Sequence, residues 1–218
     1  MRNPSFKDGL PAVHFNREYH PLPLDFYRQD TFSLVSKILG KVLVRRIGKK
    51  IIAGRIVEVE AYVGDDPASH AANGMTERNR IMFEEGGVAY VYFTYGMHFC
   101  FNIVTDRTGF PAALLVRALE PLESIEEMKR RRGTDFLKNL TNGPAKLCQA
   151  MGIDRRLNGI SLDSRELSIE DDGFVLGGGD IESSTRIGIR VATDRRWRFF
   201  IKNNVFVSRI PSARRAHR

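Results

Sequence analysis

Hydrophobic and polar positions change their spacing several times along the chain, and these changes predict separate structural elements. Residues 1–24 contain four prolines and no regular period, so we expect an N-terminal arm there, followed by one domain over residues 25–218. Asp30 is a suitable N-cap for a helix that extends to about residue 39. Four apolar residues of this segment share helical spacing and predict its buried face: Phe32, Val35, Ile38 and Leu39.

The other periodic segments mostly alternate as β-strands do. Strands are predicted over residues 41–47, 51–62, 88–95, 98–105, 112–119, 186–192 and 198–201. The first two should form a hairpin and the next three an antiparallel meander, and helices are predicted over residues 124–132 and 144–152. The fold class is therefore α+β: a single domain with a mainly antiparallel β-sheet flanked by α-helices.

Two irregular stretches interrupt this pattern. Residues 63–80 have the composition of a loop and are long for a connection without structure, which is typical of functional loops. Residues 166–180 are acidic and rich in glycine, and the predicted strands resume only after them.

The positive charge of the chain is concentrated at its C-terminal end. The formal net charge is +8, and residues 195–218 contain eight basic residues and no acidic one. A segment of this kind favours a polyanionic partner, either nucleic acid or an anionic membrane surface. The alternative is a solvated tail that only increases solubility.

Several classes of protein are excluded by what the sequence lacks. Apolar residues make up 42% of the chain, which is enough for a packed core and excludes a disordered protein. No apolar run approaches the ~18 residues of a membrane span or suits a signal peptide. Cys100 and Cys148 are far apart and should be core residues. No nucleotide-binding, metal-binding or serine-hydrolase motif occurs, so neither a metal nor a cofactor is expected.

Candidate chemistry gathers between residues 58 and 117. Strand alternation places Glu58, Glu60 and Tyr62 on one face of their strand, and Tyr90 and Tyr92 on one face of theirs. A carboxylate beside several tyrosines suits a pocket where a flat heterocycle stacks on the rings while the acid acts at its edge. The alternative is an ordinary sheet surface, because tyrosine is a good strand former.

Six blocks of the sequence resemble the alkyladenine (3-methylpurine) DNA glycosylase family. They are RIVEVEAY at residues 55–62, SH at 69–70, TERNRIMF at 76–83, YVYFTYGMHFCFN at 90–102, LVRALEP at 115–121 and GPAKL at 143–147. The blocks occur in the family's order and cover about residues 25–202. Several long motifs in one order are far more specific than a single short pattern.

The resemblance implies a role for each matched residue. Glu60 stands at the family's catalytic carboxylate, the general base that orients and deprotonates the attacking water. Arg117 matches a catalytic-site residue that helps to hold this water or the neighbouring backbone. Four residues match the substrate-binding pocket: Tyr62, His70, Tyr92 and Asn102, the last of which screens out guanine-like bases. Tyr95 matches the side chain that intercalates into DNA and fills the gap left by the flipped nucleotide.

The activity implied by the resemblance is that of a monofunctional DNA glycosylase that starts base excision repair. Such an enzyme flips alkylated or deaminated purines (3-methyladenine, 7-methylguanine, hypoxanthine, ethenoadenine) out of double-stranded DNA and hydrolyses the N-glycosidic bond. No lyase activity and no membrane contact are expected, and the enzyme should act as a monomer.

Two departures from better-known members qualify the resemblance. The chain lacks the long N-terminal extension of animal relatives, so we expect a bacterial, cytoplasmic, nucleoid-associated enzyme; a eukaryotic one would be nuclear. His98 stands where a second aromatic residue is expected, so the rim of the pocket should differ.

Three alternatives stay open at this point. A damage sensor without activity would lack Glu60, which is present, and an RNA-binding module would carry an RNP-like or KH motif, which the sequence lacks. Arg117 could also have a purely structural role, paired with a nearby acid such as Glu120.

Overall fold

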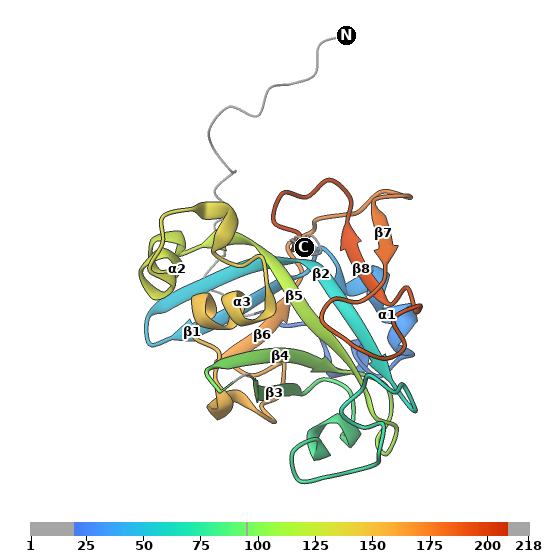
Figure 1. Ribbon diagram of the computed structural model, residues 1–218. Coiled ribbons are helices and arrows are strands. Elements are labelled where there is room, and N and C mark those ends of the chain that lie inside the picture. Colours follow the sequence, from blue (N-terminus) through green and yellow to red (C-terminus); the bar gives the residue numbers. More distant parts are fainter. Residues whose placement is uncertain (1–19, 95, 209–218) are drawn as a thin grey trace, which may run out of the picture.

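An antiparallel β-sheet organises the described part of the chain and carries its three α-helices (Figure 1). The computed structural model describes residues 20–94 and 96–208. The strands are β1 (Val42–Ile47), β2 (Lys50–Val63), β3 (Ala89–Thr94), β4 (His98–Val104), β5 (Ala112–Glu123), β6 (Leu167–Glu170), β7 (Ile181–Ser184) and β8 (Arg198–Ile201). Their order is β3-β4-β5-β2-β1-β6, with β8 paired to β2 and β7 to β8. The predicted α+β fold class is confirmed.

Strand β2 is the centre of the sheet because it has neighbours along both edges. Its first half pairs with β1 and three residues of its second half pair with β8, while β5 follows the opposite edge. The predicted hairpin and meander are both present, as β1–β2 and β3–β4–β5. Residues from β5 and β8 can therefore reach the same side chains of β2.

The predicted helices are also present. They are α1 (Thr31–Ile38), α2 (Ile125–Arg132) and α3 (Pro144–Met151), accompanied by the 3₁₀ turns η1 (Leu24–Phe26), η2 (Arg80–Phe83), η3 (Leu137–Asn139) and η4 (Arg155–Leu157). Asp30 caps α1, because its Oδ2 accepts a hydrogen bond of 2.8 Å from the Ser33 N–H. Figure 1 shows α2 and α3 together on the sheet, and α3 packs against β4 and β5.

The buried face of α1 differs from the predicted one at Phe32. Leu34 is fully buried together with Ile38, whereas Phe32 is 37% exposed. Phe32 precedes Leu34 by two residues, a rotation of about 200° around the helix axis, so it points away from the core. Its ring instead meets Trp197 edge-on, with 5.1 Å between the centroids. The prediction of Phe32 as a core residue is therefore wrong.

Two predictions in the last third of the chain are also wrong. Strand β6 forms inside the acidic, glycine-rich stretch, where Leu167–Glu170 complete the free edge of β1. The strand predicted over residues 186–192 is a loop, and β7 lies upstream of it. In this loop the N–H of the second residue, Ile187, donates to the buried Glu60 carboxylate rather than to a neighbouring strand.

The last residues of the predicted N-terminal arm belong to the folded part. The Leu22 N–H donates to the Ile169 carbonyl at 2.8 Å, and Pro21 forms a β-bridge with Glu170, so this segment covers the outer edge of β6. The rest of the arm and residues 209–218 lie outside the described residues. Within the described residues, no helix has the length and apolar character needed to cross a membrane.

Candidate active site

One row of paired residues crosses four strands and forms the base of the site. Glu60 on β2 pairs with Leu115 on β5, which in turn pairs with Asn102 on β4. Asn102 pairs with Tyr90 on β3. Directly paired residues of antiparallel strands point to the same face of the sheet. Side chains from three separate sequence motifs are thus brought into one line.

A cavity of about 400 Å³ opens on this face of the sheet. Residues 187–191 and Pro144 contribute to its lining. So do five of the residues matched by the family resemblance: Tyr62, His70, Tyr92, Asn102 and Arg117. Glu60 contacts two of these five residues. Tyr95, the predicted intercalating residue, lies outside the described residues.

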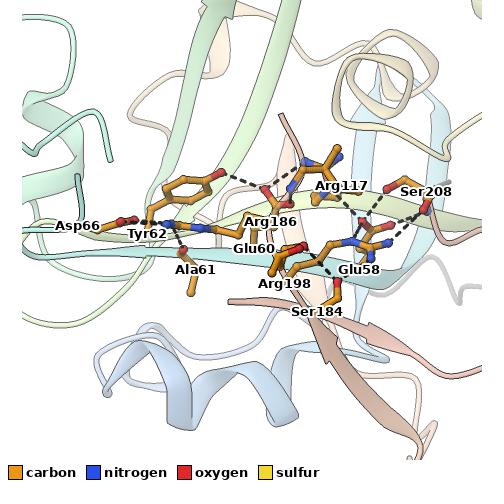
Figure 2. Close-up of polar contacts among 12 residues, drawn as sticks. Glu58, Glu60, Ala61, Tyr62, Asp66, Arg117, Ser184, Arg186, Arg198 and Ser208 are labelled. Atoms are coloured by element: carbon orange, nitrogen blue, oxygen red, sulfur yellow. Dashed lines mark hydrogen bonds and ion pairs between the residues drawn. The ribbon is translucent and has the colours of Figure 1, made fainter. Parts of the chain in front are cut away.

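The carboxylate of Glu60 is fully buried, and both of its oxygens accept hydrogen bonds (Figure 2). Oε2 accepts from the Tyr62 hydroxyl at 3.0 Å and from Arg117 Nη1 at 3.1 Å. Oε1 accepts from the main-chain N–H of Ile187 at 2.7 Å. Burial raises the pKa of Glu60, and the charge of Arg117 and the Ile187 N–H oppose that rise. A carboxylate with a raised pKa is a stronger base than a solvated one.

Arg117 joins Glu60 to a second buried carboxylate, that of Glu58. Its Nε donates to Glu58 Oε1 at 3.0 Å. The register between β2 and β5 shifts on both sides of Glu58, and irregularities of this kind redirect side chains beside active sites. The alternative pairing of Arg117 with Glu120 is wrong, because Glu120 accepts instead from Asn204 Nδ2 at 2.9 Å.

Three aromatic side chains form another wall of the cavity. The ring centroids of Tyr90 and Tyr92 are 5.3 Å apart, and His70 meets Tyr92 edge-on at 4.4 Å. Nδ1 of His70 shares a hydrogen bond of 2.8 Å with the Tyr90 hydroxyl. Desolvation by these neighbours, and then the charge of Arg78, lower the pKa of His70, while burial raises the pKa of Tyr90 to about 12. The wall is therefore uncharged near pH 7 and offers flat surfaces to an aromatic ligand.

Asn102 is held in one orientation. It is 4% exposed, and its Nδ2 donates to the main-chain carbonyl of Tyr90 at 2.9 Å. A side chain fixed in this way can discriminate between ligands by shape, because it cannot move aside without losing a buried hydrogen bond.

Two other sequence expectations have different outcomes. Cys100 and Cys148 are both buried, as predicted for core residues, and Cys100 also lines the cavity. His98, expected at the pocket rim, is exposed at the start of β4 and is not among the described residues that line the cavity.

A layer of charged residues behind Glu60 and Glu58 was not predicted. Asp66, from the long loop, and Arg186 form an ion pair in which both side chains are fully buried. The Nε of Arg198 donates to Glu58 Oε1 at 2.6 Å. Nothing in the sequence marks these pairs, because the partners are separated by more than a hundred residues and meet only in the folded sheet.

The basic C-terminal segment is partly used inside the protein. Arg198 is buried against Glu58, and Arg195 Nη1 lies 3.4 Å from Asp66 Oδ1. Arg198 is taken up by an internal carboxylate, and Arg195 shares Asp66 with Arg186, so neither is an unpaired surface cation. Of the other basic residues, Arg196 is exposed and Lys202 pairs with Glu182 at 3.1 Å. The last four lie within residues 209–218, outside the described residues.

The site thus offers a buried carboxylate, a guanidinium and a set of uncharged aromatic rings. No group of three or more His, Cys, Asp and Glu side chains is arranged to hold a metal ion within residues 20–94 and 96–208. A flat heterocycle could stack on the rings while the carboxylate acts on an atom at its edge.

Comparisons with known proteins point to a single family. A family model described as methylpurine-DNA glycosylase (MPG) matches residues 25–205. A protein of Carboxydothermus hydrogenoformans is 45% identical over 188 residues, which are 86% of this chain and 98% of that protein. A Francisella tularensis protein is 45% identical over 184 residues, 84% of this chain and 95% of its own. A Clostridium perfringens protein is 43% identical over 199 residues, which cover 85% of this chain and 97% of that protein. All three are named "Putative 3-methyladenine DNA glycosylase".

Proposed function

The chain belongs to the methylpurine-DNA glycosylase family, and from this premise we propose that it removes alkylated and deaminated purines from double-stranded DNA. The proposed substrates are 3-methyladenine, 7-methylguanine, hypoxanthine and ethenoadenine. The enzyme hydrolyses the N-glycosidic bond as a monomer, without lyase activity or a cofactor, and so starts base excision repair. The observation that carries the proposal is the buried carboxylate of Glu60 at a cavity walled by tyrosines.

The lesion must leave the duplex before it can react, because the bond to deoxyribose is inaccessible while the base is stacked. The flipped base then enters the cavity, where the rings of Tyr62 and Tyr92 replace the stacking that it has lost. We assign Tyr95 to the gap left in the helix, where an intercalated ring offsets part of the cost of flipping.

Glu60 acts on the water that attacks the sugar. As the N-glycosidic bond breaks, its electron pair leaves with the base and the sugar becomes oxocarbenium-like, which a nearby carboxylate stabilises. The water oxygen bonds to C1′ and its proton passes to Glu60. Arg117 has a supporting role: its charge favours the ionised form of Glu60.

A single carboxylate suffices for a cationic lesion. Purines methylated at N3 or N7 already carry positive charge, so the base leaves without being protonated. Hypoxanthine is neutral and must gain a proton as it leaves. Selectivity against normal purines then comes from leaving-group quality, from the ease of flipping, and from the clash between Asn102 and the exocyclic amino group of guanine. 7-Methylguanine has the same amino group, and its positive charge, which makes it a better leaving group than guanine, offsets this clash.

The surroundings of Tyr62 and Tyr92 support the proposal that neutral lesions are substrates as well as cationic ones. The Arg186 guanidinium lies 4.6 Å from the Tyr62 ring centroid, and that of Arg78 lies 5.6 Å from the Tyr92 centroid. Each ring already faces a guanidinium, which weakens its attraction for a second cation. Stacking, which neutral and cationic purines share, should therefore dominate binding.

The test of this function is base release from duplex oligonucleotides that each contain one of the four proposed lesions. Alkaline cleavage at the abasic site, followed by gel electrophoresis, reports the reaction. We expect strand cleavage only after alkali, and only in lesion-containing duplexes. Absence of release from all four would contradict the proposal, and cleavage without alkali would contradict the absence of lyase activity.

The two kinds of lesion should respond differently to pH. The pKa of Glu60 is raised, so its ionised form is lost at a higher pH than that of an ordinary glutamate as the pH falls. For a cationic methylated purine, the single-turnover rate should fall on this acid side and reach a plateau above it. For hypoxanthine the rate should fall on both sides of an optimum, because the base must be protonated. Bell-shaped pH–rate profiles of equal width for both lesions would show that the reaction requires a second acid from the protein.

A further inference from the structure

Arg186 lies directly behind the site in a fully enclosed position. Its Nη2 donates to Asp66 Oδ1 at 2.9 Å, and its Nη1 contacts the other oxygen of the same carboxylate. Nη1 also donates to the main-chain carbonyl of Ala61, between Glu60 and Tyr62, at 3.0 Å. Figure 2 shows this guanidinium beside Tyr62, reaching Asp66 on one side and Ala61 on the other.

Aromatic rings hold the same guanidinium from two sides. Its Cζ lies 4.6 Å from the centroid of Tyr62 and 5.1 Å from that of Trp197. Arg195 stacks on Trp197 at 4.5 Å and also approaches Asp66. A planar, forked cation that is paired with a carboxylate and packed between rings has one position available to it.

The main chain that follows Arg186 contacts Glu60, the proposed general base. The N–H of Ile187 donates to Glu60 Oε1 at 2.7 Å, and residues 187–191 line the cavity. Because Ile187 is the next residue, the anchored side chain of Arg186 determines where this N–H points. The Arg186 side chain also packs against the ring of Tyr62. The hydroxyl of Tyr62 donates to the other oxygen of Glu60 at 3.0 Å.

We propose that Arg186, clamped by Asp66 and by the rings of Tyr62 and Trp197, is a positioning residue that holds the Ile187 N–H on the Glu60 carboxylate. This inference rests on the proposed function of Glu60 as the base. Its consequence is that the ionised form of Glu60 is maintained in a site where burial opposes it. The groups that face or couple to this carboxylate are Arg117 on β5, Tyr62 and Glu58 on β2, Cys100 on β4 and Arg186 itself.

The chain offers a matched control for Arg186 in Arg55. Arg55 donates to both oxygens of Asp172, at 3.0 and 2.8 Å, and to the Gly40 carbonyl at 2.8 Å. Its Cζ lies 4.1 Å from the centroid of Phe174. It thus makes the same three kinds of contact as Arg186. The described residues that line the cavity include Ile187, which follows Arg186, but not Ile56, which follows Arg55.

The experiment compares Arg186→Lys with Arg55→Lys. Lysine keeps the charge but cannot make the planar, forked contact, so Ile187 should lose its fixed position only in Arg186→Lys. The titration of Glu60 is followed by carbon-13 NMR of labelled glutamate carboxyls, with Glu60→Gln identifying the signal. We expect the Glu60 titration to move to higher pH in Arg186→Lys and to stay unchanged in Arg55→Lys. The single-turnover rate on a methylated purine should fall about 10- to 100-fold in Arg186→Lys alone.

An unchanged Glu60 titration in Arg186→Lys, or an equal change in both variants, would overturn the proposal. If Arg186→Lys does not fold, Asp66→Asn replaces it, because it weakens the same clamp while keeping its shape, and the same shift is expected. The NMR titration needs no substrate. A wild-type protein that releases no base would therefore refute the proposed function without deciding the role of Arg186.

Discussion

Replacing Glu60 by glutamine should lower the rate of base release at least about 10³-fold while leaving the affinity for lesion-containing DNA within about tenfold. The amide keeps the shape of the carboxylate, so the cavity keeps its form. Its NH2 group cannot accept a hydrogen bond, so the variant loses either the contact from Ile187 or those from Tyr62 and Arg117. It cannot take a proton from water or stabilise a cationic sugar. Single-turnover rates on a duplex with one methylated purine measure the loss, and a binding titration with the same duplex measures the affinity.

Glu120→Gln is the matched control for this prediction. Glu120 lies on the neighbouring strand β5, and its carboxylate accepts from Asn204 rather than facing the cavity. We expect this variant to keep a rate close to that of the wild type. Multiple turnover by Glu60→Gln at a rate near that of the wild type would refute the assignment of Glu60 as the base.

Glu58→Ala should cost about 3–5 kcal/mol of folding free energy. Glu58 is fully buried and accepts from Arg117 Nε at 3.0 Å, from Arg198 Nε at 2.6 Å, and from the N–H and hydroxyl of Ser208 at 2.5 and 2.6 Å. Figure 2 shows these donors converging on one carboxylate. Its removal leaves Arg198 buried without that anion and Arg117 with Glu60 alone. Urea unfolding of the variant and of the wild type measures the difference.

Two further variants test whether the burial of Glu58 causes the predicted loss of folding free energy. The side chain of Glu77 is 90% exposed and pairs only loosely with Arg80, at 3.3 Å, so Glu77→Ala should change stability by less than about 0.5 kcal/mol. Glu58→Gln keeps one acceptor oxygen, so its loss of folding free energy should lie between those of Glu77→Ala and Glu58→Ala. A loss below about 1 kcal/mol for Glu58→Ala would mean that the buried arginines find other partners or water.

Most elements of the fold could be predicted because their signals are local. The Asp30 cap, the turn at Gly48 and Pro144 at the first turn of α3 all act within a few residues of the chain. The errors occur where a distant partner decides the outcome. Leu167–Glu170 become a strand because the edge of β1 is free, and residues 186–192 do not because Ile187 donates to Glu60.

The candidate site divides in the same way. Strand alternation correctly grouped Glu58 with Glu60 and Tyr62, and Tyr90 with Tyr92, since this periodicity is a local property of the backbone. The identity of the motifs pointed to the other residues of the cavity only through the family resemblance. Neither strand alternation nor the family resemblance indicated which carboxylate pairs with each buried arginine.

The sequence by itself determined the fold class, most strands and helices, and the residue types of the site, because side-chain periodicity, caps and turns depend on neighbours in the chain. Only the tertiary structure decided the row from Glu60 to Tyr90, the pairing of Arg117 with two carboxylates, and the clamp of Arg186 on Asp66. The physical reason is that sheet register and buried charge pairing join residues that are far apart in the chain. Each buried arginine must find its acid within the assembled interior, where an unpaired charge would be costly.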